Sequence, residues 1–592
     1  MSGGAGGAAA GASGVAGHGG TGAGGGGGFA GTAGGLAGAS GASGDGGGGG
    51  GAGGGGGFTA SGGGVAGSAA SAGGVGGLGG LGGGGAADAA GAPAVVTNSV
   101  LQRGHDLFRQ ATYTQPALTR AAAATMVPDT AFASATFDGA PLASALYLED
   151  GPAAGGCPAA AQGCVATGRA PGAGLFFIPT QLGGIYALDE TSGQIVWHTT
   201  FVAGPDGVRG TPAIDPATRT LFVVQGGSDH HEVHGLSVDT GLDRAGWPVI
   251  LSSSTLSQAG VPFNSVDQNQ HGALLVLNHI VYVPFGGHLG DGGNYRGWVV
   301  AIDIAAPSHF SGWVTAGAME GIWGHGGLVS DGTGVIAVTG NGRPAVHDSS
   351  TDSEEVVRLT GMATLVRSAA NVYFPAAWRS MDAADLDFGS ATPAYLPLPA
   401  GSIPSALLIA PAKPGHVYIL DGTNLSAGQY PAAGGELADL VVSNPADQSI
   451  YTSPTIYRTR SGFHVAINTA LPPAGCPAVA SQHAIVSLLI HPGESPLATV
   501  AWCAPAELNN GDQFQNEPPL STTSDGATAD PLVWFMNGAQ LTAVDGETGT
   551  PVVTTSGAAC QPENMNFPIA VKGRILVAAV DKLCAWKPAA AP

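Results

Sequence analysis

The densest group of side chains that could do chemistry is the run from Asp229 to His234, which reads DHHEVH. If this run is a strand, side chains two residues apart share a face, so His230, Glu232 and His234 would lie together. Two imidazoles and a carboxylate could bind a transition metal. The run lacks the HExxH spacing, and the alternative is a solvated hairpin between strands. We assign no metal site.

Three further histidines, His271, His288 and His325, each lie beside a glycine at the end of a predicted strand. Imidazole changes its charge near neutral pH. If the fold brings these side chains together, they could line a pocket or tune it by protonation.

A second acidic group consists of Asp382, Asp385 and Asp387. It could bind a cation, but its spacing matches no calcium loop, and the alternative is a polar connector. The chain has no G-x-S-x-G elbow, no convincing Ser, His and Asp set, no P-loop and no Rossmann fingerprint. We therefore assign no catalytic residue.

The elements that must position these groups are strands, because one phrase recurs along the chain. It is a hydrophobic strand that ends in Asp, a turn, and another strand. The clearest copies begin at Ile185–Asp189 and Leu541–Asp545, and looser copies end at Asp239, Asp303 and Asp421. A repeat of about fifty to sixty residues made of strands indicates a propeller or a solenoid.

The strand segments sort into eight groups on a four-strand pattern, which predicts a single all-β propeller of eight four-stranded blades. The fifth group is weakly marked, with Ala406–Ala410 and Val417–Asp421 its firm members, so seven blades is the alternative. The last group has three strands, and the run Ala131–Phe137 would complete it and close the ring. A short helix is expected within Pro116–Met126.

Residues 1–94 differ from the rest, since they are about half Gly, with Ala and Ser, and contain no Lys, Arg, Trp or Tyr. Such a segment cannot bury enough apolar surface to fold, so we expect a disordered low-complexity linker. The segment is either a tether that holds the folded domain away from a surface or a low-complexity expansion without a function. Residues 95–592 form the predicted propeller.

The chain carries 19 basic and 41 acidic residues and a formal charge of −22. Its only lysines are Lys413, Lys572, Lys582 and Lys587. This balance argues against binding to nucleic acid or to anionic membranes. No apolar stretch is long enough to predict a membrane span. We expect a soluble monomer with cationic or neutral partners.

Six cysteines form three pairs that are local in sequence: 157 with 164, 476 with 503, and 560 with 584. Local pairs suit disulfides, which indicates an oxidising compartment. No signal peptide follows Met1. The hypothesis is a secreted, surface or periplasmic protein whose true start, with a signal or lipid anchor, lies upstream of Met1. The alternative is a cytosolic protein with buried thiols.

The phrase YALDxxTGxxxW resembles the repeat of the pyrroloquinoline-quinone (PQQ) dehydrogenase-like propellers, or quinoprotein-like superfamily. The chain carries it as IYALDETSGQIVW (185–197) and LTAVDGETGTPVV (541–553). Segments such as RGTPAIDPATRTLFVV (209–224) resemble an uncharacterised exported subgroup. The resemblance covers roughly 104 to 592. It is specific for the fold and poorly specific for chemistry, since such blades serve enzymes, assembly factors and binding proteins.

The resemblance implies that an enzyme of this superfamily would hold PQQ between a Trp and a disulfide of adjacent cysteines, with a bridging calcium ion. No two cysteines are adjacent here. Thr339-Gly340-Asn341-Gly342 is similar to the family's Gly-Asn turn, so Asn341 is a candidate cofactor ligand. Glu354 is the candidate counterpart of the family's catalytic Asp. The alternative for Asn341 is a turn residue chosen because Asn-Gly tolerates positive φ.

These observations favour an exported, non-catalytic propeller without a cofactor that binds a protein, glycan or small molecule on one face. The alternative is a PQQ- and calcium-dependent dehydrogenase of alcohols or sugars. Convergence of Asn341, an acidic side chain, a Trp and an Arg at one end of the channel would favour the enzyme.

Overall fold

The structure is a computed structural model. It describes residues 97–152, 172–201, 207–288, 292–344, 346–361, 364–443, 449–470, 473, 476, 483–507, 518–556, 560–563 and 566–589. The linker expected over residues 1–94 lies outside these ranges, as do Cys157 and Cys164.

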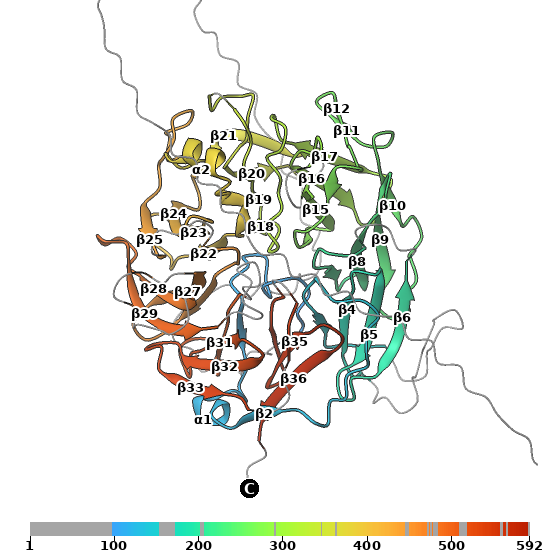
Figure 1. Cartoon of the computed structure of the whole chain (residues 1–592), viewed down its shortest axis with the longest axis vertical. Helices are drawn as coiled ribbons and strands as arrows, with labels where there is room; N and C mark the ends of the chain where they lie inside the picture. Colours follow the sequence, from blue (N-terminus) through green and yellow to red (C-terminus); the bar gives the residue numbers. More distant parts are fainter. Residues whose placement is uncertain are drawn as a thin grey trace, which may run out of the picture. The chain divides into compact units, whose positions relative to one another are not determined.

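The described chain folds into eight four-stranded antiparallel sheets that follow one another around a ring in chain order (Figure 1). Each sheet is a propeller blade whose first strand lies next to the channel. The eight-bladed propeller predicted from the repeats is therefore confirmed, and the alternative of seven blades is wrong. The fifth blade gains two strands that its sequence marked poorly, Ala394–Pro397 and Ala438–Val441.

In each of the first four blades, the four strands are consecutive in the chain and each pairs with the next as a meander. They are β3 (Leu146–Leu148), β4 (Leu175–Pro179), β5 (Gly184–Asp189) and β6 (Ile195–Thr200); β7 (Ala213–Asp215), β8 (Thr220–Gly226), β9 (His231–Ser237) and β10 (Val249–Leu251); β14 (Leu275–Leu277), β15 (Ile280–Gly287), β16 (Trp298–Asp303) and β17 (Phe310–Val314); β18 (Val329–Ser330), β19 (Val335–Val338), β20 (Val356–Thr360) and β21 (Val366–Tyr373).

The last four blades follow the same order, with an N-terminal strand as the outermost strand of the eighth. They are β22 (Ala394–Pro397), β23 (Ala406–Pro411), β24 (His416–Asp421) and β25 (Ala438–Val441); β26 (Thr455–Arg458), β27 (Phe463–Ala470), β28 (His483–Ile490) and β29 (Ala498–Ala506); β30 (Leu520–Thr523), β31 (Leu532–Asn537), β32 (Gln540–Asp545) and β33 (Pro551–Thr554); β34 (Ile569–Val571), β35 (Arg574–Ala578), β36 (Leu583–Pro588) and β2 (Met126–Pro128).

The remaining elements are short and lie outside the meanders. They are β1 (Thr112–Thr114), which pairs in parallel with β30; the hairpin of β11 (Ser257–Gln258) and β12 (Val261–Pro262); β13 (Gln268–Asn269), which pairs with β15; α1 (Arg120–Ala123), inside the predicted helix; α2 (Trp378–Ala384); and a 3-10 turn, Phe388–Ser390.

The repeated phrase has a structural cause in its aspartate. Asp189 ends β5, and its Oδ1 accepts the backbone N–H groups of Thr191 (3.0 Å) and Ser192 (2.9 Å). Asp545 ends β32 and accepts the N–H of Thr548 (2.8 Å) in the same way. Such side-chain turns reverse the chain without a long loop, and a glycine with positive φ completes each of them. The phrase therefore marks the hairpin between the third and fourth strands of a blade.

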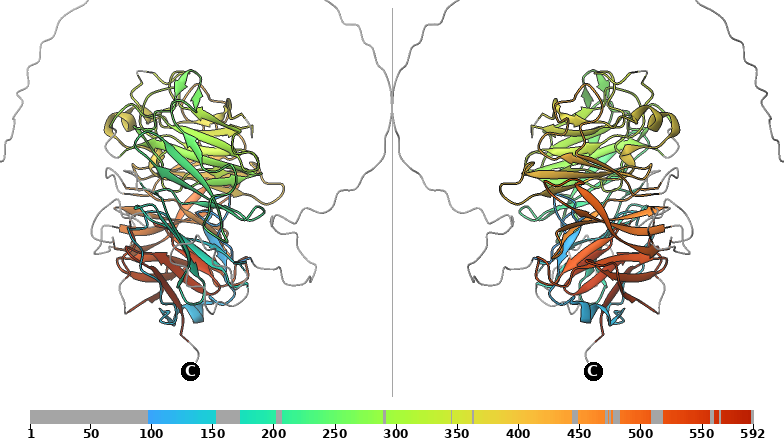
Figure 2. Two further views of the ribbon diagram at one scale, coloured as in Figure 1. Left: turned by 90° about the vertical axis from the view of Figure 1, so that its right-hand side faces the viewer. Right: turned by 90° about the vertical axis from the view of Figure 1, so that its left-hand side faces the viewer.

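The ring closes through an N-terminal strand, as expected, but not through the predicted one. β2 pairs antiparallel with β36, Val127 opposite Lys587. The run Ala131–Phe137 is not a strand, because its N–H groups bind carbonyl groups in the turns of two different blades. Ala135 donates to Gly193 O (2.9 Å), and Phe137 donates to Asp581 O (2.8 Å). In the side views of Figure 2, the red C-terminal blades lie beside the blue N-terminal strands, where the ring closes.

The residues before the helix, Val100–Gln115, follow the inside of the ring (blue in the centre of Figure 1). We call them the channel segment. Their carbonyl groups accept backbone N–H groups from the innermost strands of five blades at 2.7–3.0 Å. The donors are Ile214, Ser330, Tyr395, Ile456 and Ser521. The channel segment thus ties the blades together from within.

The described cysteines form two disulfides, Cys476–Cys503 with a Cα–Cα distance of 5.5 Å and Cys560–Cys584 with 6.3 Å. Both pairings were predicted from sequence and are confirmed. No helix in the described part of the chain is long and apolar enough to cross a membrane.

Candidate functional site

The two faces of the ring differ because all innermost strands run in the same direction. We call the face where the chain enters the innermost strands the entry face, and the opposite one the exit face. The connections before the first strands and between the second and third strands lie at the entry face. A group of charged and aromatic residues from these connections, which we call the entry-face site, comprises Trp323, Asn341, Glu354, Asp382, Asp387 and Lys413.

Asn341 lies in the connection between β19 and β20 and is 7% exposed. Its backbone N–H donates to Asp387 Oδ1 (2.8 Å), so the turn is fixed to the segment before β22. Asn341 is absent from the non-glycine residues with positive φ in the described chain, whereas Glu354, with φ of 52°, is present. A need for positive φ therefore does not explain Asn341.

Glu354 is fully buried in the same connection. Its Oε2 accepts the backbone N–H of Phe388, and its Oε1 has no hydrogen-bond partner. Burial and then the charge of Asp387 raise the pKa of Glu354 well above its ordinary value. Asp382 Oδ2 is a second buried oxygen without a partner, and burial raises the pKa of this carboxyl as well. The site thus holds carboxylate oxygens that the protein itself leaves unsatisfied.

Lys413 supplies the positive charge of the site. Its ammonium lies 2.9 Å from Asp387 Oδ2 and 3.4 Å from Asp385 Oδ1. The same Nζ lies 5.9 Å from the ring centroids of Trp323 and Tyr451, within range of a cation–π interaction. Since the side chain is 5% exposed, the ammonium is held in a fixed place beside the indole.

The three histidines noted in the sequence gather at the same face, beside Arg209. The rings of His271 and His325 lie 5.5 Å apart in an edge-to-face arrangement. Burial, followed by the charges of Arg209 and His288, lowers the pKa of His271 to about 3. His325 Nδ1 is buried without a hydrogen-bond partner, and His325 follows Trp323 by two residues. Burial also lowers the pKa of His325 well below its ordinary value, so the rings of His271 and His325 are neutral near pH 7. The positive charge that adjoins the carboxylates through the Trp323 segment is therefore that of Arg209.

The DHHEVH run remains a local network. Glu232 contacts His230 (3.2 Å) and His234 (3.2 Å), and His234 also contacts Asp243 (3.0 Å), so these side chains share a face as predicted. Within the described ranges, no group of three or more His, Cys, Asp and Glu side chains is arranged to hold a metal ion.

Comparison with known proteins yields a likeness of fold. No family model matches the chain, and no curated protein matches it. Among solved structures, a quinohemoprotein alcohol dehydrogenase from Comamonas testosteroni is 12% identical, with a TM-score of 0.48 over 84% of this chain and 82% of that one. A europium-containing methanol dehydrogenase is 14% identical, with a TM-score of 0.49 over 82% of this chain and 90% of that one. BamB from Moraxella catarrhalis is 15% identical, with a TM-score of 0.27 over 50% of this chain and 66% of that one.

The propeller fold that the repeats predicted is shown by the sheet topology of this chain. The solved structures, each with a TM-score below 0.5, are similar to it in fold only. Identities of this size say nothing of activity, and the chemistry has to be argued from the residues of this chain.

A second group of buried carboxyls lies behind Asn341 and offers a pH test. Glu320 is 1% exposed; its Oε2 accepts the N–H groups of Gly317 (2.9 Å) and Asp352 (3.1 Å), and its Oε1 accepts the Thr351 hydroxyl. Burial raises the pKa of Glu320 from 4.5 to about 7. Because folding favours the protonated acid, its stabilising contribution is complete below pH 4.5 and is lost as the pH rises through 7.

We therefore expect Glu320→Gln, which imitates the protonated form, to raise the free energy of unfolding at pH 8 by on the order of 3 kcal/mol and to change little at pH 4. Urea unfolding at pH 4, 6 and 8 measures this. Glu494→Gln, at an exposed turn, is the matched control and should leave all three values unchanged. Equal stability of Glu320→Gln and parent at pH 8 would show that Glu320 is ionised at no cost.

Sequence reasoning found Asn341, Glu354 and the three histidines of this face but did not assign Trp323, Asp387 or Lys413. The signal for Lys413 was present: it is one of four lysines in the chain, and the described structure buries it alone among them. Asp387 belonged to the acidic group considered as a cation loop or a polar connector. Its contact with Asn341 is tertiary and has no local signature.

Proposed function

We propose that this protein is an exported, non-catalytic propeller that binds a small anionic molecule and a hard divalent cation together at the entry-face site. The observation that carries the proposal is the pair of buried oxygens without a partner, Glu354 Oε1 and Asp382 Oδ2. An unsatisfied buried polar atom costs roughly 1–3 kcal/mol, so native proteins keep few of them without a reason. A ligand that satisfies both oxygens recovers this cost.

The donor types indicate the ligand chemistry. Carboxylate and amide oxygens, here from Glu354, Asp382 and Asn341, are the ligands that calcium prefers. Since the described carboxylates do not form a complete metal cage, an anionic molecule would have to supply further oxygens to the cation. Arg209, which lies beside His271, would bind the negative charge of that molecule. This goes beyond the sequence analysis, which assigned no metal and no cofactor.

The location is part of the proposal. Two disulfides support an oxidising compartment, so we place the protein at the cell surface, in the periplasm or outside the cell, as a monomer. The deep position of the polar atoms favours a small molecule over a protein or a glycan chain as the occupant of this site.

The second candidate is a PQQ- and calcium-dependent dehydrogenase of alcohols or sugars. In its favour, Trp323, Asn341 and Asp387 come together from three connections, with Lys413 where an arginine was expected. The oxygen donors suit calcium, and the indole of Trp323 suits a planar cofactor. The adjacent cysteines are missing, and the described disulfides lie in blades six and eight. The fit is therefore partial.

In that candidate, the bound quinone would supply the two-electron oxidant. Asp387, held by the Asn341 N–H and paired with Lys413, is the carboxylate that could accept the proton of a substrate hydroxyl. Asn341 and Glu354 would serve as oxygen ligands of the cation.

One titration tests both candidates. The full chain is titrated with calcium, then with PQQ in the presence of calcium, while tryptophan fluorescence and dye-linked oxidation of alcohols and sugars are followed. We expect saturable, calcium-dependent quenching without turnover. Glu354→Gln should weaken calcium binding at least ~10-fold, because an amide cannot release a proton to become the charged oxygen donor that a carboxyl can become.

Asp348→Asn is the matched control, since Asp348 is exposed in the same connection and bonds only to its own turn. It should bind calcium like the parent. Turnover that depends on PQQ would replace the first candidate by the second. If the folded protein binds neither calcium nor PQQ, both candidate functions are wrong for this site.

A further inference from the structure

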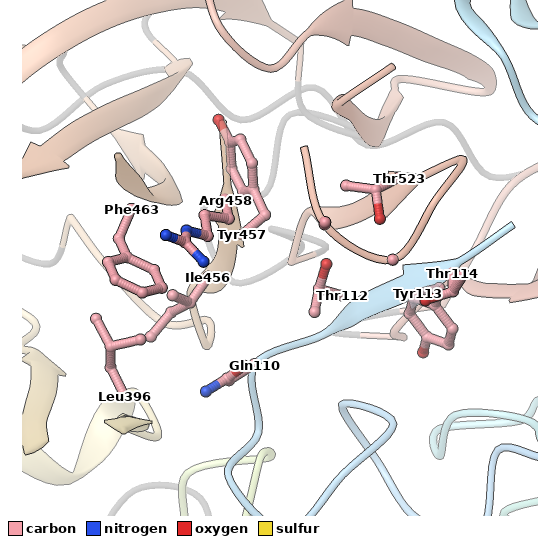
Figure 3. A pocket seen from close by; sticks show the side chains of 12 residues that line it. Gln110, Thr112, Tyr113, Thr114, Leu396, Ile456, Tyr457, Arg458, Phe463 and Thr523 are labelled. Atoms are coloured by element: carbon pink, nitrogen blue, oxygen red, sulfur yellow. The ribbon is translucent and has the colours of Figure 1, made fainter. Parts of the chain in front are cut away.

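A pocket of about 260 Å³ opens on the exit face, between the channel segment and the ends of the innermost strands of blades five, six and seven. Its walls are shown in Figure 3. Its lining comes from the channel segment, from β22, β26 and β30, from the start of β27 and from the loop after β30. The entry-face site lies where innermost strands begin, so this pocket is a separate place on the ring. Its size suits one small molecule.

One wall of the pocket consists of hydroxyl groups. Thr112 and Thr114 lie two residues apart on β1 and therefore share a face. Thr523 is the register partner of Thr114 in the parallel pair of β1 and β30. Tyr113, between the two threonines, has its side chain on the opposite face of β1. There the centroid of its ring lies 4.6 Å from that of the His105 ring. Alternation along one strand thus puts hydroxyls toward the pocket and the aromatic ring into the core.

The opposite wall is apolar and carries a cation. Leu396, Ile456 and Phe463 form it, and Figure 3 shows the Arg458 guanidinium next to the Phe463 ring. The guanidinium carbon lies 5.3 Å from that ring centroid. The described structure pairs no carboxylate with Arg458, whose side chain is exposed at the pocket. Gln110 closes the floor, with its Nε2 bound to Tyr395 O (2.8 Å) and its side-chain oxygen left as an acceptor.

We propose that this pocket binds a carboxylated sugar, a uronic acid. A sugar ring has an apolar C–H face and a rim of hydroxyls, which match an aromatic wall facing threonine hydroxyls and an amide oxygen. The planar, two-pronged guanidinium of Arg458 is the side chain best suited to a carboxylate. A neutral hexose would leave this cation unmatched, and an apolar acid would leave the three hydroxyls unmatched.

The negative charge of the protein does not prevent this binding. The formal charge is −22, but at physiological ionic strength fields between exposed charges are screened beyond about 8 Å. In the adjoining loop, Asp525 accepts the N–H groups of Ala527 (2.8 Å) and Ala529 (2.9 Å), so its carboxylate is bonded within its own loop and not to Arg458.

The test is calorimetric titration of the full chain with glucuronate and galacturonate, beside glucose and galactose at equal ionic strength. We expect saturable binding of a uronate and at least ten-fold weaker binding of the neutral sugar. Arg458→Met, which keeps the length and the contact with Phe463, should weaken uronate binding at least ten-fold. Thr523→Val, which removes one hydroxyl without changing the shape, should weaken it several-fold.

Arg460→Met is the matched control, because Arg460 is exposed two residues further along the same hairpin and does not line the pocket. It loses the same charge and should bind uronate like the parent. A uronate-rich polysaccharide is titrated in parallel. Binding of the polymer alone, lost in Arg458→Met, would assign the site to the end of a glycan chain rather than to a free sugar.

The proposal is overturned if no uronate and no uronate polymer binds to the folded protein, or if Arg458→Met and Arg460→Met bind alike. It does not depend on the entry-face proposal. Glu354→Gln should leave uronate binding unchanged, so failure at one site is distinguishable from failure at the other.

Discussion

Replacing Arg109 with methionine is expected to lower the free energy of unfolding by roughly 4–6 kcal/mol, the largest effect of any single change proposed for this protein. Arg109 lies in the channel segment and is 1% exposed. Its guanidinium donates to three backbone carbonyls from separate parts of the chain: Leu328 O (2.8 Å), Leu274 O (2.9 Å) and Arg103 O. Methionine fills similar space but leaves all three acceptors unsatisfied.

The measurement is urea unfolding monitored by tryptophan fluorescence, with Arg460→Met as the exposed control. Arg460→Met should change stability by less than about 0.5 kcal/mol. Arg109→Lys should recover only part of the loss, because one ammonium cannot reach three acceptors in the planar geometry of a guanidinium. An Arg109→Met protein as stable as the parent would mean that the channel segment is held by its backbone bonds alone.

The channel segment explains why part of this fold was hidden in the sequence. Gly104, His105, Arg109 and Ala111 all adopt positive φ, which three of these residues rarely do. This backbone is imposed by hydrogen bonds to five blades rather than by local preference. A segment that owes its shape to contacts hundreds of residues away carries no local pattern, and residues 100–115 mix polar and apolar side chains without a period.

The blades, in contrast, were predictable because their signal is local. A strand that ends in Asp and a glycine turn specify the outer hairpins of blades one and seven within ten residues, at Asp189 and Asp545. The innermost strands were harder to find. β30, with the sequence LSTT, is fully buried, because neighbouring blades and β1 enclose it, so polarity does not alternate along it. β22 was missed for a similar reason.

The strand that closes the ring was assigned to the wrong segment from the sequence. Closure requires a fourth strand for blade eight, and it was assigned to Ala131–Phe137, a run that belonged to no other group. The structure uses β2 instead, a three-residue strand at the outer edge, where Val127 is 41% exposed. An outermost strand needs little hydrophobicity, because one side of it faces solvent. The sequence of β2 therefore carries little signal of a strand.

The candidate site was predictable only in part, for a different reason. Asn341 and Glu354 belong to one connection and could be found by resemblance to a motif. Lys413 and Asp387 complete the site from connections of two other segments, 26 residues apart in the chain. A propeller converts such separations into contacts at one face, so the site exists only after the ring has formed.

Replacing Lys413 with methionine is expected to cost about 3–5 kcal/mol, because it leaves buried carboxylates without their counter-charge. Asp387 would keep only the Asn341 N–H (2.8 Å), next to the unsatisfied Glu354 oxygen. The charge of Lys413 lowers the pKa of Glu354 and so offsets part of the increase that burial causes. Without Lys413, that pKa should rise further and the carboxyl should be more fully protonated. Urea unfolding at pH 7 measures the loss.

A double-mutant cycle separates the charge effect from simple loss of packing. Asp387→Asn removes the negative charge while its side-chain oxygen can still accept the Asn341 N–H. If the ion pair is what Lys413 provides, the double variant Lys413→Met/Asp387→Asn should recover at least half of the loss. Independent, additive losses would mean that Lys413 stabilises the site through its contacts with Trp323 and Tyr451 instead. The two results also differ for function. Only if Lys413 acts through its charge does Asp387 depend on Lys413 to serve as the proton acceptor of the second candidate.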